Sequence, residues 1–87
     1  MTDEARDPLL QEREKTHGLF AKNANISQQL KDIFRMNLDY RKIHPVHREA
    51  LDMIALKLSR ILSGQWNYKD HWDDIAGYAK LGSESCV

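Results

Sequence analysis

The residues best suited to chemistry lie near the C-terminal end of the chain, where Asp70, Asp73 and Asp74 fall within five positions. On a helix these three carboxylates share one face. They repel one another unless solvent, a cation or basic side chains neutralise them. A hard cation such as Mg²⁺ could bind one or two of their oxygens and bridge to a phosphate. The acids therefore mark a candidate metal–phosphate site.

Two basic residues, Lys57 and Arg60, precede these acids at a spacing that places them nearby. If both segments form an antiparallel helical hairpin centred near residues 65–66, Arg60 lies level with Asp70 and His71, and Lys57 lies level with Asp74. Two interpretations remain open. The groups form only salt bridges that stabilise the hairpin, helped by the helix dipole, or the bases hold a phosphate while the acids hold a metal ion.

Other polar and aromatic residues have both structural and functional interpretations. Asn23 and Ser27 fall near the inner face of their helix, where they could read a nucleobase, or could cap the backbone if the helix begins there. Aromatic residues around the last turn and helix are expected in the core, with base stacking as the alternative. They are Trp66, Tyr68, Trp72 and Tyr78.

Two further candidates have weaker support. His44 and His47 form an HxxH pattern at a helix start, without the further ligands that zinc requires. Cys86 lies in the C-terminal segment, and the sequence assigns no basic group that would activate its thiol.

The apolar spacing predicts an all-α protein with four helices in a compact arrangement and a single domain over 1–87. Asp7-Pro8, Pro45 and the glycines supply the start and stop signals. The expected helices cover about 8–17, 19–37, 45–63 and 69–81, with a loop over 38–44 and flexible tails at about 1–6 and 83–87. Gly82 is expected to end the last helix.

The third expected helix carries apolar residues on two faces, since Met53 and Leu56 lie opposite Leu58. A helix of this kind must bury both faces. In so small a chain, a central position or a partner subunit would do so, and we expect a homo-oligomer.

Composition excludes several classes of protein. The 87 residues contain 13 basic and 13 acidic side chains and one cysteine. No block rich in Lys and Arg appears, which argues against binding a nucleic-acid polymer. The single cysteine permits no internal disulfide, and no apolar run of about 20 residues is present. We expect a cytoplasmic protein with no membrane span.

The runs EALDMIALKLSRILSG and DHWDDIAGYAKL, preceded by EREKTHGLF, resemble a group of small phage and prophage proteins of unknown function. These are in turn similar to the MazG-like all-α nucleotide pyrophosphohydrolases. That enzyme family implies a helical bundle working as a dimer or tetramer. It also implies Mg²⁺-dependent hydrolysis of nucleoside triphosphates, with an EExxE cluster on one helix and ExxD on the next.

The nearest equivalent of the first acidic cluster is Glu49-Ala-Leu-Asp52, which lacks the doubled Glu. In the hairpin register, Asp52 also lies about five residues, or roughly 7–8 Å, beyond the level of Asp74. One metal joining all these acids would need another register or a second subunit. A metal-activated water would perform any hydrolysis.

The expected function is thus a phage-type, MazG-like protein that binds a nucleotide or related phosphorylated ligand, with Mg²⁺ as the matching ion. Lys57 and Arg60 would contact the phosphate and Asp70 and Asp74 the metal. Asp73, Glu49 and Asp52 would be further metal ligands. The alternative is a non-catalytic protein that binds a host protein through an oligomeric helical surface.

Overall fold

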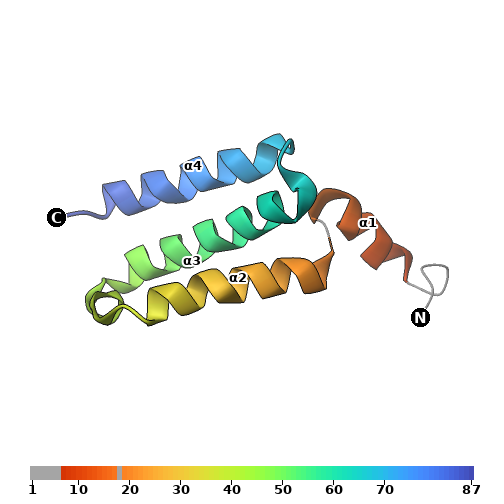
Figure 1. The fold of residues 1–87 in the computed structure, drawn as a ribbon. Coiled ribbons are helices and arrows are strands. Elements are labelled where there is room, and N and C mark those ends of the chain that lie inside the picture. Colours follow the sequence, from red (N-terminus) through yellow and green to blue (C-terminus); the bar gives the residue numbers. More distant parts are fainter. Residues whose placement is uncertain (1–6, 18) are drawn as a thin grey trace.

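The computed structural model describes residues 7–17 and 19–87, which form four α-helices joined by short turns (Figure 1). No strand occurs in these described ranges, so the predicted all-α class and the four helices are confirmed. The α-helices are α1 (Pro8–His17), α2 (Phe20–Arg35), α3 (Pro45–Arg60) and α4 (Lys69–Glu84). Two short helical turns, η2 (Leu38–Lys42) and η3 (Ile61–Gln65), lie before and after α3.

Three of the helices form a flat layer with α3 in the middle, while α1 projects from one end (Figure 1). Both α2 and α4 pack on α3 and run antiparallel to it. The molecule measures 51 × 26 × 18 Å, and its radius of gyration is 15.1 Å. A compact domain of this length has a radius of gyration of about 12 Å. The expectation of a compact arrangement is therefore wrong, because the third dimension of the layer is only one helix deep.

The helix starts follow the predicted signals. The carboxylate of Asp7 accepts a hydrogen bond of 2.7 Å from the backbone N–H of Leu9, and Pro8 is the first residue of α1. His44 caps α3, since its Nδ1 accepts from the N–H of Val46 at 3.2 Å, and Pro45 follows at the first helical position. Both caps satisfy backbone donors that a helix start leaves unpaired.

The region between α3 and α4 departs from the prediction. The α-helix ends at Arg60, and Ile61–Gln65 continues as a π-helical turn. Gly64 has a φ of 126° in this turn. Only glycine adopts such a conformation without strain, so Gly64 reverses the chain as expected, but through a wider turn.

The prediction that Gly82 ends the last helix is wrong, because α4 continues to Glu84. A Cβ atom at Gly82 would lie 3.9 Å from the Cβ of Ala50 and from Cδ2 of His47. The carbonyl oxygen of Gly82 also lies 2.9 Å from Nε2 of His47. Gly82 thus belongs to the contact between α3 and α4, and the tail expected from residue 83 is helical in its first two residues. The tail expected at 1–6 lies outside the described residues.

The segment predicted as a loop over 38–44 contains the 3₁₀ turn η2. The ring of Tyr40 in this turn contacts Phe34 of α2, with ring centroids 5.9 Å apart. This aromatic contact packs the turn against the end of α2.

More polar than apolar residues are buried in the described part of the layer. Among the described residues, the buried apolar set is Ala50, Ala55 and Ile61. The buried polar set is Asn23, Ser27, Ser59 and His71. None of the described helices has the length and apolar character needed to cross a membrane.

Candidate functional site

The predicted ion pair between Lys57 and Asp74 is present and joins α3 to α4. Nζ of Lys57 lies 2.9 Å from Oδ2 of Asp74. Only 12% of the Lys57 side chain is exposed, compared with 46% for Asp74. The lysine is thus held between the helices, while its acidic partner keeps contact with solvent. The predicted hairpin register is confirmed at this level.

Arg60 and His71 lie close enough to act on the same carboxylate. The hydrogen bond from Lys57 lowers the pKa of Asp74 from its ordinary value of 3.8, and the charges of Lys57, His71 and Arg60 add to this effect. Partial burial opposes it. We call Lys57, Arg60, His71 and Asp74 the Lys57 cluster.

His71 is the largest fully buried side chain among the described residues, with 2% exposed. The ring of Tyr68 packs on it at a centroid distance of 4.8 Å and an angle of 62°. Sequence reasoning placed His71 beside the acids without giving it a role. Its position three residues before Asp74, on the same face of α4, was the available signal.

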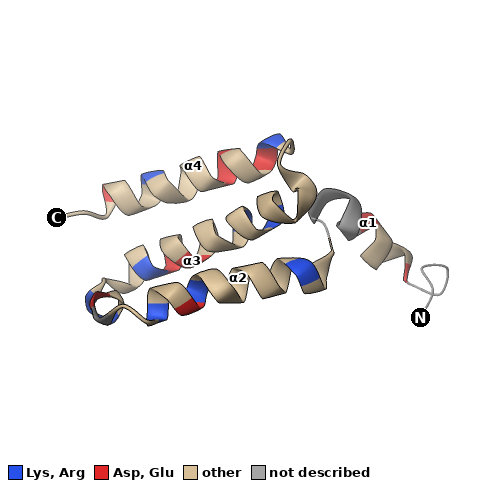
Figure 2. Cartoon of the chain, viewed as in Figure 1, with Lys and Arg blue, Asp and Glu red and all other residues tan. Residues whose placement is uncertain are grey.

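The other two acids of α4 have partners of their own. The hydroxyl of Tyr68 donates a hydrogen bond to Asp70, which is the largest cause of a raised Tyr68 pKa. Asp73 pairs with Lys69 one turn earlier, which raises the pKa of that lysine. Figure 2 shows these acids in the first half of α4, beside the basic residues at the end of α3. Asp70, Asp73 and Asp74 therefore lie on adjacent turns, each beside a different donor.

Glu49 and Asp52 do not join this group. Asp52 lies on the side of α3 that faces α2 and η2, where it accepts a hydrogen bond of 2.9 Å from the hydroxyl of Tyr40. Glu49 lines the same small pocket as Asp52, together with Tyr40, Pro45 and Arg48. The predicted set of five acids is thus divided between two sides of α3.

No group of three or more His, Cys, Asp or Glu side chains that could hold a metal ion occurs within the described ranges. The five acids named as metal ligands therefore do not form one metal centre within the chain. The physical reason is helical geometry. Asp52 and Asp74 would have to share a face of the hairpin, yet Asp52 lies about 140° around α3 from Lys57, the partner of Asp74.

Asn23 and Ser27 are on the inner face of α2, as predicted, but they cap nothing. The helix begins at Phe20 after the N-cap Leu19, so both residues lie within it. The hydroxyl of Ser63 donates a hydrogen bond to Oδ1 of Asn23. In this antiparallel register Ser27 is level with Ser59, and both are buried. Sequence reasoning missed Ser59 and Ser63, whose i, i+4 spacing matches Asn23 and Ser27 across the interface.

The expectation that the aromatic residues form the core is wrong for both tryptophans. Trp66 is 67% exposed and Trp72 52% exposed. Nε1 of Trp72 donates a hydrogen bond of 2.9 Å to the carbonyl oxygen of Trp66, which fixes the indole along the turn. Tyr68 and Tyr78 are half-buried.

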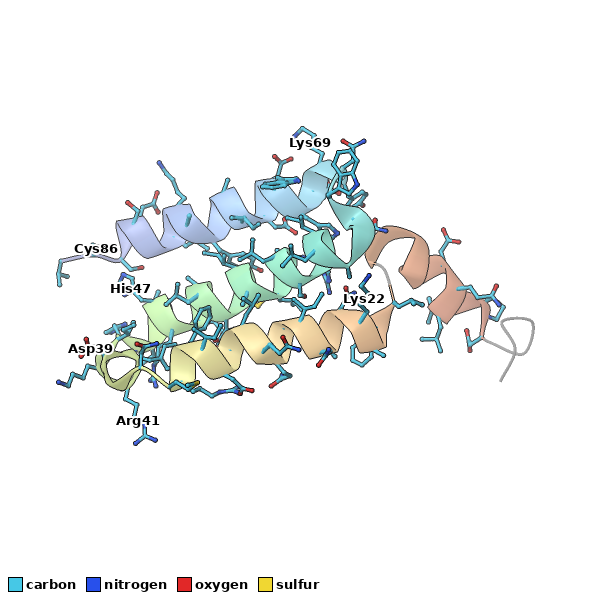
Figure 3. The ribbon with its side chains drawn as sticks, viewed as in Figure 1. Lys22, Asp39, Arg41, His47, Lys69 and Cys86 are labelled. Atoms are coloured by element: carbon cyan, nitrogen blue, oxygen red, sulfur yellow. The ribbon has the colours of Figure 1, made fainter. Side chains whose placement is uncertain are left out.

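The two histidines at the start of α3 have structural roles. His44 is the N-cap, and His47 contacts the carbonyl oxygen of Gly82. Sγ of Cys86 lies 3.6 Å from Nε2 of His47, so a basic group does lie near this exposed thiol. Figure 3 shows His47 and Cys86 together at the end of the layer away from α1.

The arrangement of the Lys57 cluster suits an anion better than an isolated metal ion. Two basic side chains, Lys57 and Arg60, act on one carboxylate across the α3–α4 contact. Charged hydrogen bonds from such groups are strong and favour phosphate or carboxylate ligands. The π-helical turn begins directly after Arg60.

Comparison with known proteins gives one result. No curated protein and no solved structure matches the chain. A family profile described as a domain of unknown function, DUF6378, matches residues 1–86. Because this match covers nearly the whole chain, the protein belongs to the DUF6378 family.

Proposed function

We propose that this protein binds a nucleotide or a related phosphorylated small molecule, and that the Lys57 cluster receives the phosphate. The observation that carries the proposal is the burial of charged and polar side chains at the α3–α4 contact. Lys57 is 12% exposed and His71 2% exposed. Burying such groups costs free energy that an apolar contact would not, so their presence favours a functional role.

Phosphate would enter by replacing Asp74 as the partner of Lys57. The Asp74 side chain is nearly half exposed, so it has room to turn towards solvent, whereas Lys57 is held between the helices. Arg60, which already acts on Asp74 electrostatically, would supply a second charged donor. The exchange keeps the buried lysine paired in both states.

Mg²⁺ enters the proposal as the ion that accompanies the phosphates of a nucleotide. Mg²⁺ is usually bound through one or two carboxylates plus substrate phosphates, with water completing its shell. Asp70 and Asp73 are exposed carboxylates beside the Lys57 cluster and would serve as those ligands. Glu49 and Asp52 lie on another side of α3 and are left out of this role.

The resemblance to phage proteins of the MazG-like type also bears on the biological setting of this function. It supports a phage-encoded protein that works as a homo-oligomer in the host cytoplasm.

Thermal unfolding in the presence of nucleotides, cyclic dinucleotides and inorganic phosphate, each with and without Mg²⁺, tests the proposal. A ligand at 100 times its Kd stabilises the folded state by about 2.7 kcal/mol. In a domain of this size that raises Tm by roughly 10–20 °C. Arg60→Met should remove the shift. Lys80→Met serves as the matched control, because Lys80 is 75% exposed and pairs with Glu84 at the far end of α4.

The second candidate function is binding to a host protein through an exposed helical surface. The exposure of Leu62 (63%), Trp66 (67%) and Trp72 (52%) favours it. Tryptophan is enriched among the residues that dominate binding energy at protein interfaces. Under this alternative, no small ligand raises Tm, whereas a protein partner does.

A further inference from the structure

The chain exposes more surface than a folded monomer of its mass should. Its accessible surface is 6,665 Å². A monomeric protein of 10.2 kDa exposes about 5,300 Å². The excess of about 1,350 Å² exceeds the roughly 800 Å² that each partner buries in a standard interface. It falls in the range of obligate homodimers.

An apolar stripe runs along one open face of the layer. Leu51, Leu58 and Leu62 lie within about 40° of one another around α3. Around the axis of α3, these three leucines lie between the side that faces α4 and the side that faces α2. Ala50 marks the first side, and Ser59, which is level with Ser27 of α2, marks the second. Leu62 is 63% exposed, and Leu51 and Leu58 are half-buried.

The stripe continues onto α4. Trp72, Ile75 and Ala79 follow one another at i, i+3 and i+7 on one side of that helix. A groove of about 360 Å³ joins the two helices, and both Leu51 and Ala79 line it. We call these six residues the leucine face. None of them carries a charge.

We propose that the leucine face is the interface of a homodimer, in which two layers pack face to face. A two-fold interface brings the same patch from both chains together, so an uncharged patch fits a second copy of itself without charge complementarity. The excess area matches what such a dimer buries, and Trp72 offers an aromatic anchor on each side. This inference rests on the homo-oligomer named under the proposed function and identifies its contact surface.

This interface differs from the one expected from the sequence, in which Met53 and Leu56 would contact the partner subunit. Both are half-buried, and they lie on the other side of α3 from Leu58. Arg60 is also on that other side, about 180° around the helix from Leu51. Packing through the leucine face therefore leaves Arg60 of each chain away from the interface and open to a ligand.

Light scattering of the purified full chain, without nucleotide, provides the test. Wild type at tens of micromolar should have a mass of about 20 kDa, twice that of the chain. Leu62→Glu should give about 10 kDa, because it places unpaired charges in an apolar contact. Leu81→Glu is the matched control and should remain a dimer, since Leu81 is similarly exposed, at 55%, on the opposite side of α4 from Trp72.

A second variant guards against a folding artefact. Ala76→Arg replaces an exposed alanine next to Trp72 and Ile75 with a good helix former, and should also give monomers with unchanged helical circular dichroism. A wild-type monomer, or a dimer that survives both Leu62→Glu and Ala76→Arg, would overturn the assignment. A dimer that dissociates in Leu56→Glu, but not in Leu62→Glu or Ala76→Arg, would also overturn the assignment. Because no ligand is present, these results are independent of whether the Lys57 cluster binds phosphate.

Discussion

Nζ of Lys57 and Oδ2 of Asp74 lie 2.9 Å apart, and this pair joins the last turn of α3 to α4. The lysine is largely enclosed and the aspartate is half exposed. Removing only one partner would leave the other charge uncompensated. The pair therefore couples the stability of the hairpin to the chemistry of the candidate site.

The first prediction concerns acid stability. Asp74 has a lowered pKa in the folded protein, so its contribution to stability is complete above its ordinary pKa of 3.8. That contribution is lost as the pH falls through the lowered value. Urea unfolding of wild type and Asp74→Asn should differ at pH 7, and the difference should shrink towards zero as the pH drops below about 3.8. A difference that stays constant from pH 7 to pH 2 would contradict this assignment.

The second prediction separates stability from binding. Lys57→Met combined with Asp74→Leu replaces the ion pair by apolar side chains of similar length. Such replacements are often neutral or stabilising, whereas removing only one partner of an enclosed pair destabilises the protein. The double variant should keep the Tm of wild type within a few degrees and lose the nucleotide-induced shift. Retention of that shift would rule out the Lys57 cluster as the phosphate site.

The third prediction concerns two glycines with opposite roles. Gly77 lies inside α4 with open space where a Cβ would stand, whereas Gly64 has a φ of 126°. Gly77→Ala should stabilise the protein by roughly 0.5–1 kcal/mol, because glycine is a poor helix former. Gly64→Ala should destabilise it by about 1 kcal/mol or more, since alanine is strained at that φ. Differential scanning calorimetry should show a higher Tm for Gly77→Ala and a lower Tm for Gly64→Ala, with the larger shift for Gly64→Ala.

The fourth prediction concerns the polar contact between α2 and the π-helical turn. The hydroxyl of Ser63 donates to Oδ1 of the buried Asn23. Asn23→Ala should cost about 0.5–1.5 kcal/mol, the usual net contribution of one hydrogen bond, because the Ser63 hydroxyl keeps the carbonyl oxygen of Arg60 as an acceptor at 3.1 Å. A double-mutant cycle with Ser63→Ala should show that the two changes together cost less than their sum. Additive costs would show that the side chains act independently.

Sequence reasoning found the helices because their boundaries depend on local chemistry. Pro8 and Pro45 fix their own φ near the helical value, and Gly64 permits a positive φ that other residues avoid, so the elements they begin or end could be read directly. Gly82 was misread because its role depends on a distant partner. Its small size serves the contact with Ala50, and no local pattern distinguishes that from a helix stop.

The difference between local signals and contacts with distant partners also explains which parts of the candidate site could be predicted. The pairing of Lys57 with Asp74 followed from counting residues back from the hairpin turn, which is a local operation. The separation of Asp52 from the acids of α4 required knowing that α2 and η2 occupy one side of α3. That side supplies Tyr40, the partner that Asp52 has in the structure. The exposure of Trp72 likewise reflects a layer that is one helix deep, which composition does not reveal.

The order of helices in the layer has a consequence for folding kinetics. Since α3 and α4 adjoin through one short turn, their hairpin can form from contacts that are close in sequence, and such topologies fold in microseconds to milliseconds. Docking of α2 closes a connection of similar length, over residues 36–44, but α2 makes a smaller contact with α3 than α4 does. During synthesis α2 leaves the ribosome before its partner helix, and an isolated helix of 16 residues is only marginally stable in water. We therefore expect the hairpin to form first and α2 to dock last. In stopped-flow measurements, Asn23→Ala should accelerate unfolding and leave the refolding rate nearly unchanged.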